Sequence, residues 1–125
     1  MSDVEKKKVL VIDDDDTIIA QVEAILDQNG FIPIVASNGP SGLEKTKSEN
    51  PDVIMLDRRM PDMNGSEVLD VLKGDESTQD IPVIMLTGDN DIKDVSENFE
   101  QGAVDYIVKP FSADNIVMRI QKVLN

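Results

Sequence analysis

Short apolar runs alternate with stretches of helical periodicity along the whole chain, and this alternation limits the possible folds more than any other feature. The runs are VLVI (9–12), FIPIVA (31–36), VIML (53–56), VIML (83–86) and VDYIV (104–108). Strands that alternate with helices predict a parallel sheet covered by helices on both faces. A chain of 125 residues fits one domain of common size, so we expect a single α/β domain over 1–125.

The intervals between these runs carry apolar residues at helical spacing. Helices are expected over Ile18–Leu26, 39–49, Val68–Leu72, Ile92–Phe99 and Ile116–Leu124. The fourth of these five helices has a thin apolar stripe of Ile92, Val95 and Phe99. We therefore expect it to be weakly anchored and able to shift.

Two of the runs have the character of edge strands. FIPIVA contains Pro33, which lacks a backbone N–H and belongs at the edge of a sheet. VDYIV alternates polar and apolar residues, which suits the other edge. The second and fifth strands are therefore expected at the edges, an arrangement that fits a flavodoxin-like three-layer sandwich with the order 2-1-3-4-5. Sheets of this order bind ligands outside the carboxyl ends of the strands, between the first and third.

Composition excludes several classes of chemistry. The chain has no Cys and no His, so it has no disulfide, no thiolate nucleophile and no imidazole base. Its net charge of −13 disfavours a nucleic-acid partner, and Lys6-Lys7-Lys8 is its only basic cluster. The apolar runs are too short to span a membrane, and MSDVEKKK lacks the apolar segment of a signal peptide. We expect a cytoplasmic protein that binds neither nucleic acid nor membrane.

Polar residues follow the apolar runs where the ligand site of such a sheet is expected. Asp13 and Asp14 follow the first run, Asp57 the third, Thr87 the fourth and Lys109 the fifth. Three close carboxylates repel one another, and a hard divalent cation removes the repulsion. Mg²⁺ suits such oxygen ligands, with Mn²⁺ as an alternative. A lysine and a hydroxyl could then hold phosphoryl oxygens while an aspartate acts as the nucleophile.

In their order and spacing, these motifs resemble the receiver domains of bacterial two-component response regulators, in particular the stand-alone, chemotaxis-regulator-like kind. The shared motifs are an acidic pair, MLD with MPDMNG downstream, MLT, an aromatic residue three before a lysine, and KP. The resemblance covers the whole chain. It implies a phosphorelay switch that catalyses its own phosphorylation and dephosphorylation, and not an enzyme acting on other substrates.

The resemblance also assigns roles around the acceptor. Asp57 would accept a phosphoryl group from a phosphohistidine on a sensor histidine kinase or a histidine phosphotransfer protein. Asp14, Asp57 and the backbone carbonyl of Arg59 would ligate Mg²⁺, and Asp13 would do so directly or through water. Lys109 would pair with the phosphoryl group.

Further implications concern the switch and its partners. Thr87 would bond a phosphoryl oxygen, and Tyr106 would swing into the space that Thr87 leaves. The peptide bond between Lys109 and Pro110 would be cis. The face formed by the fourth helix, fifth strand and fifth helix would bind a downstream protein, and the surroundings of the first helix would dock the phosphodonor.

Four residues near the site have less specific interpretations. Asp15 and Asp16 suit the positive end of the following helix, whose dipole favours acidic side chains. The side chain of Arg59 is expected to flank the mouth of the site opposite Asp89. We hypothesise that these two side chains pair and hinder hydrolysis of the phosphorylated aspartate.

Two alternatives remain. VIDDDDT also resembles the first motif of haloacid-dehalogenase-like phosphatases, with Asp13 as the nucleophile, Asp15 as the general acid and Thr17 in support. That family needs an acidic pair after its lysine, which is missing after Lys109, and it leaves Asp57 unexplained. The other alternative is a receiver-like binding module that never accepts phosphate.

Overall fold

The chain folds into a five-stranded parallel sheet between two layers of helices. The computed structural model describes residues 6–88 and 92–125, with only the backbone described for 92–95. The strands are β1 (Lys8–Ile12), β2 (Ile32–Ala36), β3 (Val53–Asp57), β4 (Val83–Thr87) and β5 (Asp105–Val108). The helices are α1 (Asp16–Gln28), α2 (Gly39–Glu49), α3 (Gly65–Gly74), α4 (Ile92–Gln101) and α5 (Ala113–Leu124).

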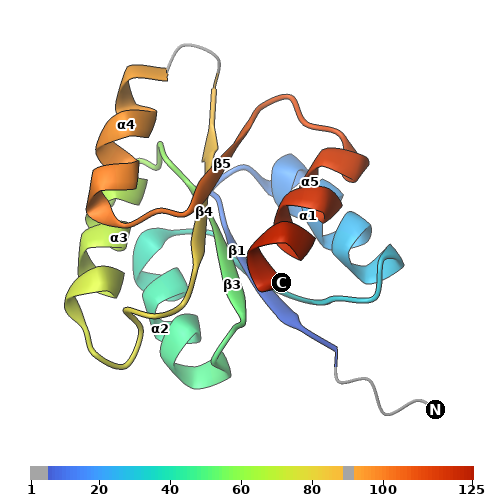
Figure 1. Cartoon of the computed structure of the whole chain (residues 1–125), viewed down its shortest axis with the longest axis horizontal. Helices are drawn as coiled ribbons and strands as arrows, with labels where there is room; N and C mark the ends of the chain where they lie inside the picture. The colour runs from blue at the N-terminus through green and yellow to red at the C-terminus, as the bar shows by residue number, and fades with distance from the viewer. Residues whose placement is uncertain (1–5, 89–91) are drawn as a thin grey trace.

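The sheet has the order β2-β1-β3-β4-β5, as expected from the sequence. β2 pairs with β1 alone, with Pro33 opposite Val9, and β5 pairs with β4 alone. Helices α1 and α5 cover one face of the sheet, and α2, α3 and α4 cover the other (Figure 1). The predicted fold class and both edge strands are therefore confirmed.

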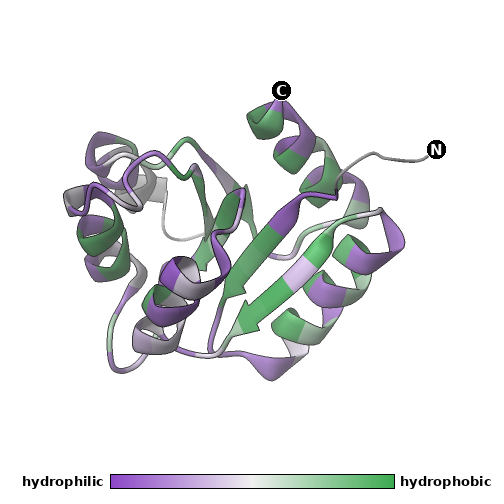
Figure 2. Ribbon diagram, turned by 90° about the horizontal axis from the view of Figure 1, so that it is seen from below, coloured by the Kyte–Doolittle hydropathy of each residue, from purple (hydrophilic) through white to green (hydrophobic). Residues whose placement is uncertain are grey.

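Alternating side chains of the central strands fill two separate cores. Leu10 and Ile12 of β1 point into the core beneath α2 and α3, whereas Val9 and Val11 point into the core beneath α1 and α5. This division follows from the strand geometry, because successive side chains point to opposite faces. The strands are accordingly apolar along most of their length, while the helices carry polar residues outside (Figure 2). The central strands thus provide a rigid base for the residues at their carboxyl ends.

Side-chain caps begin four of the helices. Asp15 caps α1 and accepts hydrogen bonds from the backbone N–H groups of Thr17 and Ile18, which confirms its expected place at a helix N-terminus. The other caps are Asn38 for α2, Asn64 for α3 and Ser112 for α5. The longest helix has 13 residues. Within the described parts of the chain, no helix has both the length and the apolar character needed to cross a bilayer.

Candidate functional site

The carboxyl ends of four strands carry the polar residues singled out from the sequence. Backbone hydrogen bonds extend the sheet by one residue at this edge and fix their relative positions. The N–H of Asp13 donates to the Ala36 carbonyl at 3.1 Å, and the N–H of Lys109 donates to the Thr87 carbonyl at 2.7 Å. Asp57 is the last residue of β3 and Thr87 the last of β4. The predicted site therefore lies along one edge, the upper one in Figure 1.

Three carboxylates form a compact cluster at this edge. Asp13, Asp14 and Asp57 each have an oxygen within 4.8 Å of those of the other two. Asp13 is fully buried and Asp57 is 6% exposed, whereas Asp14 is open to solvent. They contribute to a pocket of about 330 Å³ whose remaining lining residues are Asp15, Arg59, Thr87, Gly88 and Lys109. The cluster is thus buried at its base and reached from one side.

Lys109 provides the positive charge inside this cluster. Its ammonium nitrogen lies 3.0 Å from Asp13 Oδ2 and 3.2 Å from Asp57 Oδ1. The other oxygen of Asp13 accepts a hydrogen bond from the N–H of Asp15 at 2.9 Å. Asp13 is therefore held at both oxygens, whereas the Lys109 ammonium and the Arg59 N–H both lie against Oδ1 of Asp57.

Burial and neighbouring charges shift the pKa values of Asp57 and Lys109. Burial, and then the negative charge of Asp13, raise the pKa of the Asp57 carboxyl from 3.8 to about 7, although Lys109 acts in the opposite direction. For Lys109, burial alone would lower the pKa of the ammonium. Its hydrogen bond to Asp13 and the charge of Asp57 outweigh burial, so the net direction is upward. One ammonium thus only partly compensates two buried carboxylates.

The donor set fits a hard divalent cation. It consists of oxygens from three carboxylates, which are the ligands that Mg²⁺ prefers. The unrelieved repulsion between Asp13 and Asp57 would decrease when a cation binds. Arg59, whose carbonyl is the expected fourth protein ligand, lines the same pocket, and its backbone nitrogen lies 3.5 Å from Asp57 Oδ1. The position of the Arg59 carbonyl as a ligand stays a prediction.

The loop that carries Arg59 is tied to the start of α3. The N–H of Gly65 donates to the Arg58 carbonyl at 2.8 Å. A Cβ at position 65 would overlap the Asp57 carbonyl oxygen and lie 2.8 Å from Arg58 Cα. Only glycine therefore lets α3 begin against the end of β3, a constraint that the sequence alone did not reveal.

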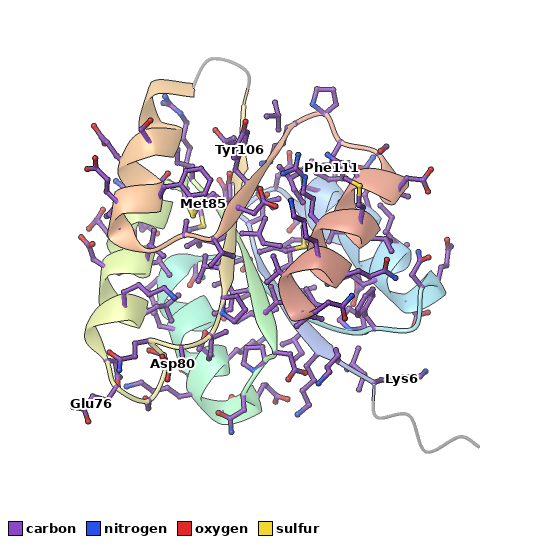
Figure 3. The ribbon with its side chains drawn as sticks, in the orientation of Figure 1. Lys6, Glu76, Asp80, Met85, Tyr106 and Phe111 are labelled. Carbon is purple, nitrogen blue, oxygen red and sulfur yellow. The ribbon has the colours of Figure 1, made fainter. Side chains whose placement is uncertain are left out.

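The two expected switch residues lie on β4 and β5. Thr87 is 2% exposed, and its hydroxyl lies 3.4 Å from the Gly88 carbonyl. Tyr106 is half-buried on β5, between α4 and α5 (Figure 3). The Phe99 ring packs edge-on against it with centroids 6.0 Å apart, and the Arg119 guanidinium carbon lies 5.9 Å from its centroid. Tyr106 thus contacts residues from both neighbouring helices.

Three further expectations concern the Lys109–Pro110 peptide bond, the role of Asp15 and the partner of Arg59. The Lys109–Pro110 peptide bond is cis, as the resemblance implied. The carboxylate of Asp15 caps α1, whereas the phosphatase alternative requires it as a general acid. Asp89, the expected partner of Arg59, lies outside the described residues, as do the side chains of Ile92 and Val95.

Sequence reasoning missed a polar contact between α3 and α4. Asn98 of α4 is 2% exposed and donates a hydrogen bond to Ser66 Oγ at 3.0 Å. The apolar stripe of α4 gave no reason to bury an asparagine. The available signal was its spacing, because Asn98 comes three residues after Val95, a member of the apolar stripe expected from the sequence.

Comparisons with known proteins agree with this geometry. A family model for the response regulator receiver domain matches residues 9–121. The phosphate regulon transcriptional regulatory protein PhoB of Klebsiella pneumoniae is 38% identical over 118 residues, which make up 94% of this chain and 52% of PhoB. The DNA-binding response regulator MtrA of Mycolicibacterium smegmatis is 34% identical over 119 residues, or 95% of this chain and 51% of MtrA.

The chain therefore spans about half the length of these curated relatives. Among solved structures, the chemotaxis protein CheY4 of Vibrio cholerae superposes with a TM-score of 0.91 at 30% identity, covering 96% of this chain and 100% of CheY4. The family match, the strand order and the acidic cluster lead to one assignment. The chain belongs to the response regulator receiver domain family.

Proposed function

We propose that the chain is a phosphorelay receiver in which Asp57 accepts a phosphoryl group. One observation carries this proposal: two buried carboxylates, one exposed carboxylate and one ammonium converge at the carboxyl edge of the sheet. Asp57 lines the pocket and has its Oδ1 3.2 Å from the Lys109 ammonium, which supports its choice as the nucleophile. We further propose that one receiver domain extends over 1–125.

In the proposed reaction, an oxygen of the ionised Asp57 attacks the phosphorus of a phosphohistidine. The new O–P bond forms as the P–N bond breaks, and the electron pair of that bond returns to the imidazole nitrogen of the donor. Lys109, already 3.2 Å from Asp57, is placed to pair with the phosphoryl oxygens after transfer. Catalysis of such a transfer needs mainly positioning and charge compensation, to which Lys109 would contribute.

Mg²⁺ is the cofactor that we propose for this site, with Mn²⁺ as the alternative. Asp13, Asp14, Asp57 and the Arg59 carbonyl would hold it, and when bound it would neutralise charge on the transferring phosphoryl group. The chain itself holds Asp13 in place, through hydrogen bonds from the Asp15 N–H and the Lys109 ammonium, so that Asp13 is preorganised. The same residues would serve hydrolysis of phospho-Asp57, which is why we propose self-catalysed dephosphorylation as well.

The proposed output is a change at Thr87 and Tyr106 followed by protein binding. Tyr106 lies between α4 and α5, so any movement of its ring alters the surface formed by α4, β5 and α5. Phe99 and Met118 on this surface are 43% and 54% exposed. We propose that a downstream protein binds there and that a histidine kinase or phosphotransfer protein docks beside α1. A cytoplasmic location, without binding to nucleic acid or membrane, stays a prediction.

The test is phosphorylation by acetyl phosphate, with and without Mg²⁺. We expect a Mg²⁺-dependent gain of one phosphoryl mass in the intact protein, abolished in Asp57→Asn and retained in Glu23→Gln, which removes an exposed charge from α1. Labelling that persists in Asp57→Asn but disappears in Asp13→Asn would instead favour the phosphatase alternative. Absence of labelling with both acetyl phosphate and a cognate kinase would favour the binding module that never accepts phosphate.

A further inference from the structure

Polar side chains join α4 to α3, in a contact that we call the α3–α4 seam: Ser66, Asp70, Asn98 and Gln101. The Asn98 amide nitrogen donates to Ser66 Oγ at 3.0 Å. The Gln101 amide nitrogen donates to Asp70 Oδ1 at 2.9 Å and lies 3.3 Å from the Ser66 carbonyl. Asn98 is 2% exposed, so its bond to Ser66 is largely shielded from water, whereas the bond between Gln101 and Asp70 is exposed. Where side chains of α4 are described, hydrogen bonds thus provide much of its attachment to α3.

The charge of Asp70 sets the direction of this hydrogen-bond chain. A carboxylate only accepts hydrogen bonds, so Gln101 must turn its NH₂ group toward Asp70. The Gln101 oxygen then accepts from the Asn98 amide nitrogen at 2.8 Å. Both donors of Asn98 are thereby used, and its oxygen is buried without a partner in the described parts of the chain. Such an acceptor costs free energy, which a small displacement of α4 could relieve.

Ser66, the first residue of the α3–α4 seam, lies one residue after the contact between Gly65 and the Asp57 carbonyl. Ser66 follows Gly65, which packs directly against the Asp57 carbonyl and donates its N–H to the Arg58 carbonyl. There is no room for a side chain at this contact, so the end of β3 and the first turn of α3 must move together. A displacement of the Asp57 backbone would therefore be passed to Ser66 through packed backbone, and Ser66 contacts Asn98 directly.

We propose that Ser66 and Asn98 are positioning residues that couple occupancy of the Asp57 site to the docking of α4 on α3. This inference rests on the proposed function, since it requires the site to change when a phosphoryl group is present. The proposed coupling passes through α3. It is therefore separate from the changes proposed at Thr87 on β4 and Tyr106 on β5. Because coupling is reciprocal, loosening the seam also alters the affinity of the site for its ligand.

The test is hydrogen exchange of the α4 amides in the presence of Mg²⁺ alone or Mg²⁺ with beryllium fluoride, a phosphoryl analogue. In the wild type, we expect the analogue to change the hydrogen-exchange rates of the backbone amides of residues 96–101. In Ser66→Ala and in Asn98→Ala, we expect this change to shrink by about 2- to 30-fold, the range typical of substitutions that alter coupling. The double variant should show no greater loss than the stronger single variant, because both residues belong to one contact.

Val71→Ala provides the matched control, because Val71 lies on the same helix but is 46% exposed and outside the seam. It should keep the wild-type response. A purely structural role for the seam would lower stability equally with and without the analogue, and would leave the ratio of the two exchange rates unchanged. That result in Ser66→Ala and Asn98→Ala, with a normal wild-type response, would overturn the coupling and leave the proposed function standing. A wild type that fails to bind the analogue at Asp57 would refute the proposed function itself.

Discussion

Neutralising Asp57 should stabilise the protein in the absence of a divalent cation, and the gain should depend on pH. The pKa of Asp57 is raised from 3.8 to about 7 in the folded state. The folded state therefore holds this proton more tightly than the unfolded chain does, and the stability of the wild type falls as pH rises from about 4 to about 7. In Asp57→Asn this loss is absent.

The expected gain in the free energy of unfolding follows from the size of the pKa shift of Asp57. One unit of pKa corresponds to about 1.4 kcal/mol, so a shift of about three units sets a ceiling near 4 kcal/mol above pH 7. Local relaxation lowers this figure, and we expect a gain of about 2–4 kcal/mol at pH 8 that largely disappears near pH 4. Added Mg²⁺ should shrink the gain, because it stabilises the ionised wild-type cluster.

Urea unfolding with EDTA present, at pH 4.5 and pH 8, measures this difference. Glu23→Gln controls for the loss of one negative charge from a chain with a net charge of −13. It should change the free energy of unfolding by less than about 0.5 kcal/mol, because surface substitutions are usually that small. If Asp57→Asn matched the wild type at pH 8, or gained equally at both pH values, repulsion and burial at Asp57 would not be the cause.

Three further outcomes follow from the same contacts. Mg²⁺ and a proton should compete at Asp57, so calorimetric titration should give about tenfold weaker Mg²⁺ binding at pH 6 than at pH 8; equal affinities would contradict the raised pKa. Asp15→Ala should lower the free energy of unfolding in urea by about 1 kcal/mol through loss of the α1 cap, and no loss would show that the cap contributes nothing. Gly65→Ala should lower the thermal midpoint through overlap with the Asp57 carbonyl, whereas Gly74→Ala, with open space around it, should not; similar effects of both would argue against the close contact.

Much of the fold was predictable because its signals are local. The apolar runs marked all five strands, and Pro33 identified an edge that the pairing of β2 with β1 alone confirms. Asp13, Asp57, Thr87 and Lys109 each follow or end a buried run, so the topology itself brings them to one edge. Their convergence therefore needed only the strand order, without any detail of side-chain packing.

The features that escaped prediction depend on contacts between elements. Nothing local shows that the Lys109 ammonium reaches both Asp13 and Asp57, because this depends on the register of β5 relative to β1 and β3. Asparagine is usually a surface residue, whereas Asn98 is buried and donates a hydrogen bond to Ser66 of α3. Gly65 has the appearance of an ordinary turn residue until the Asp57 carbonyl is placed against it.

The most direct test of the central claim is to locate the phosphoryl group chemically. An acyl phosphate on an aspartate is reduced by borohydride, which converts the labelled residue to homoserine. After incubation with Mg²⁺ and acetyl phosphate, we expect peptide mass spectrometry to find homoserine at position 57 and at no other aspartate. Homoserine at position 13, or at no position in a fully folded protein, would contradict the account.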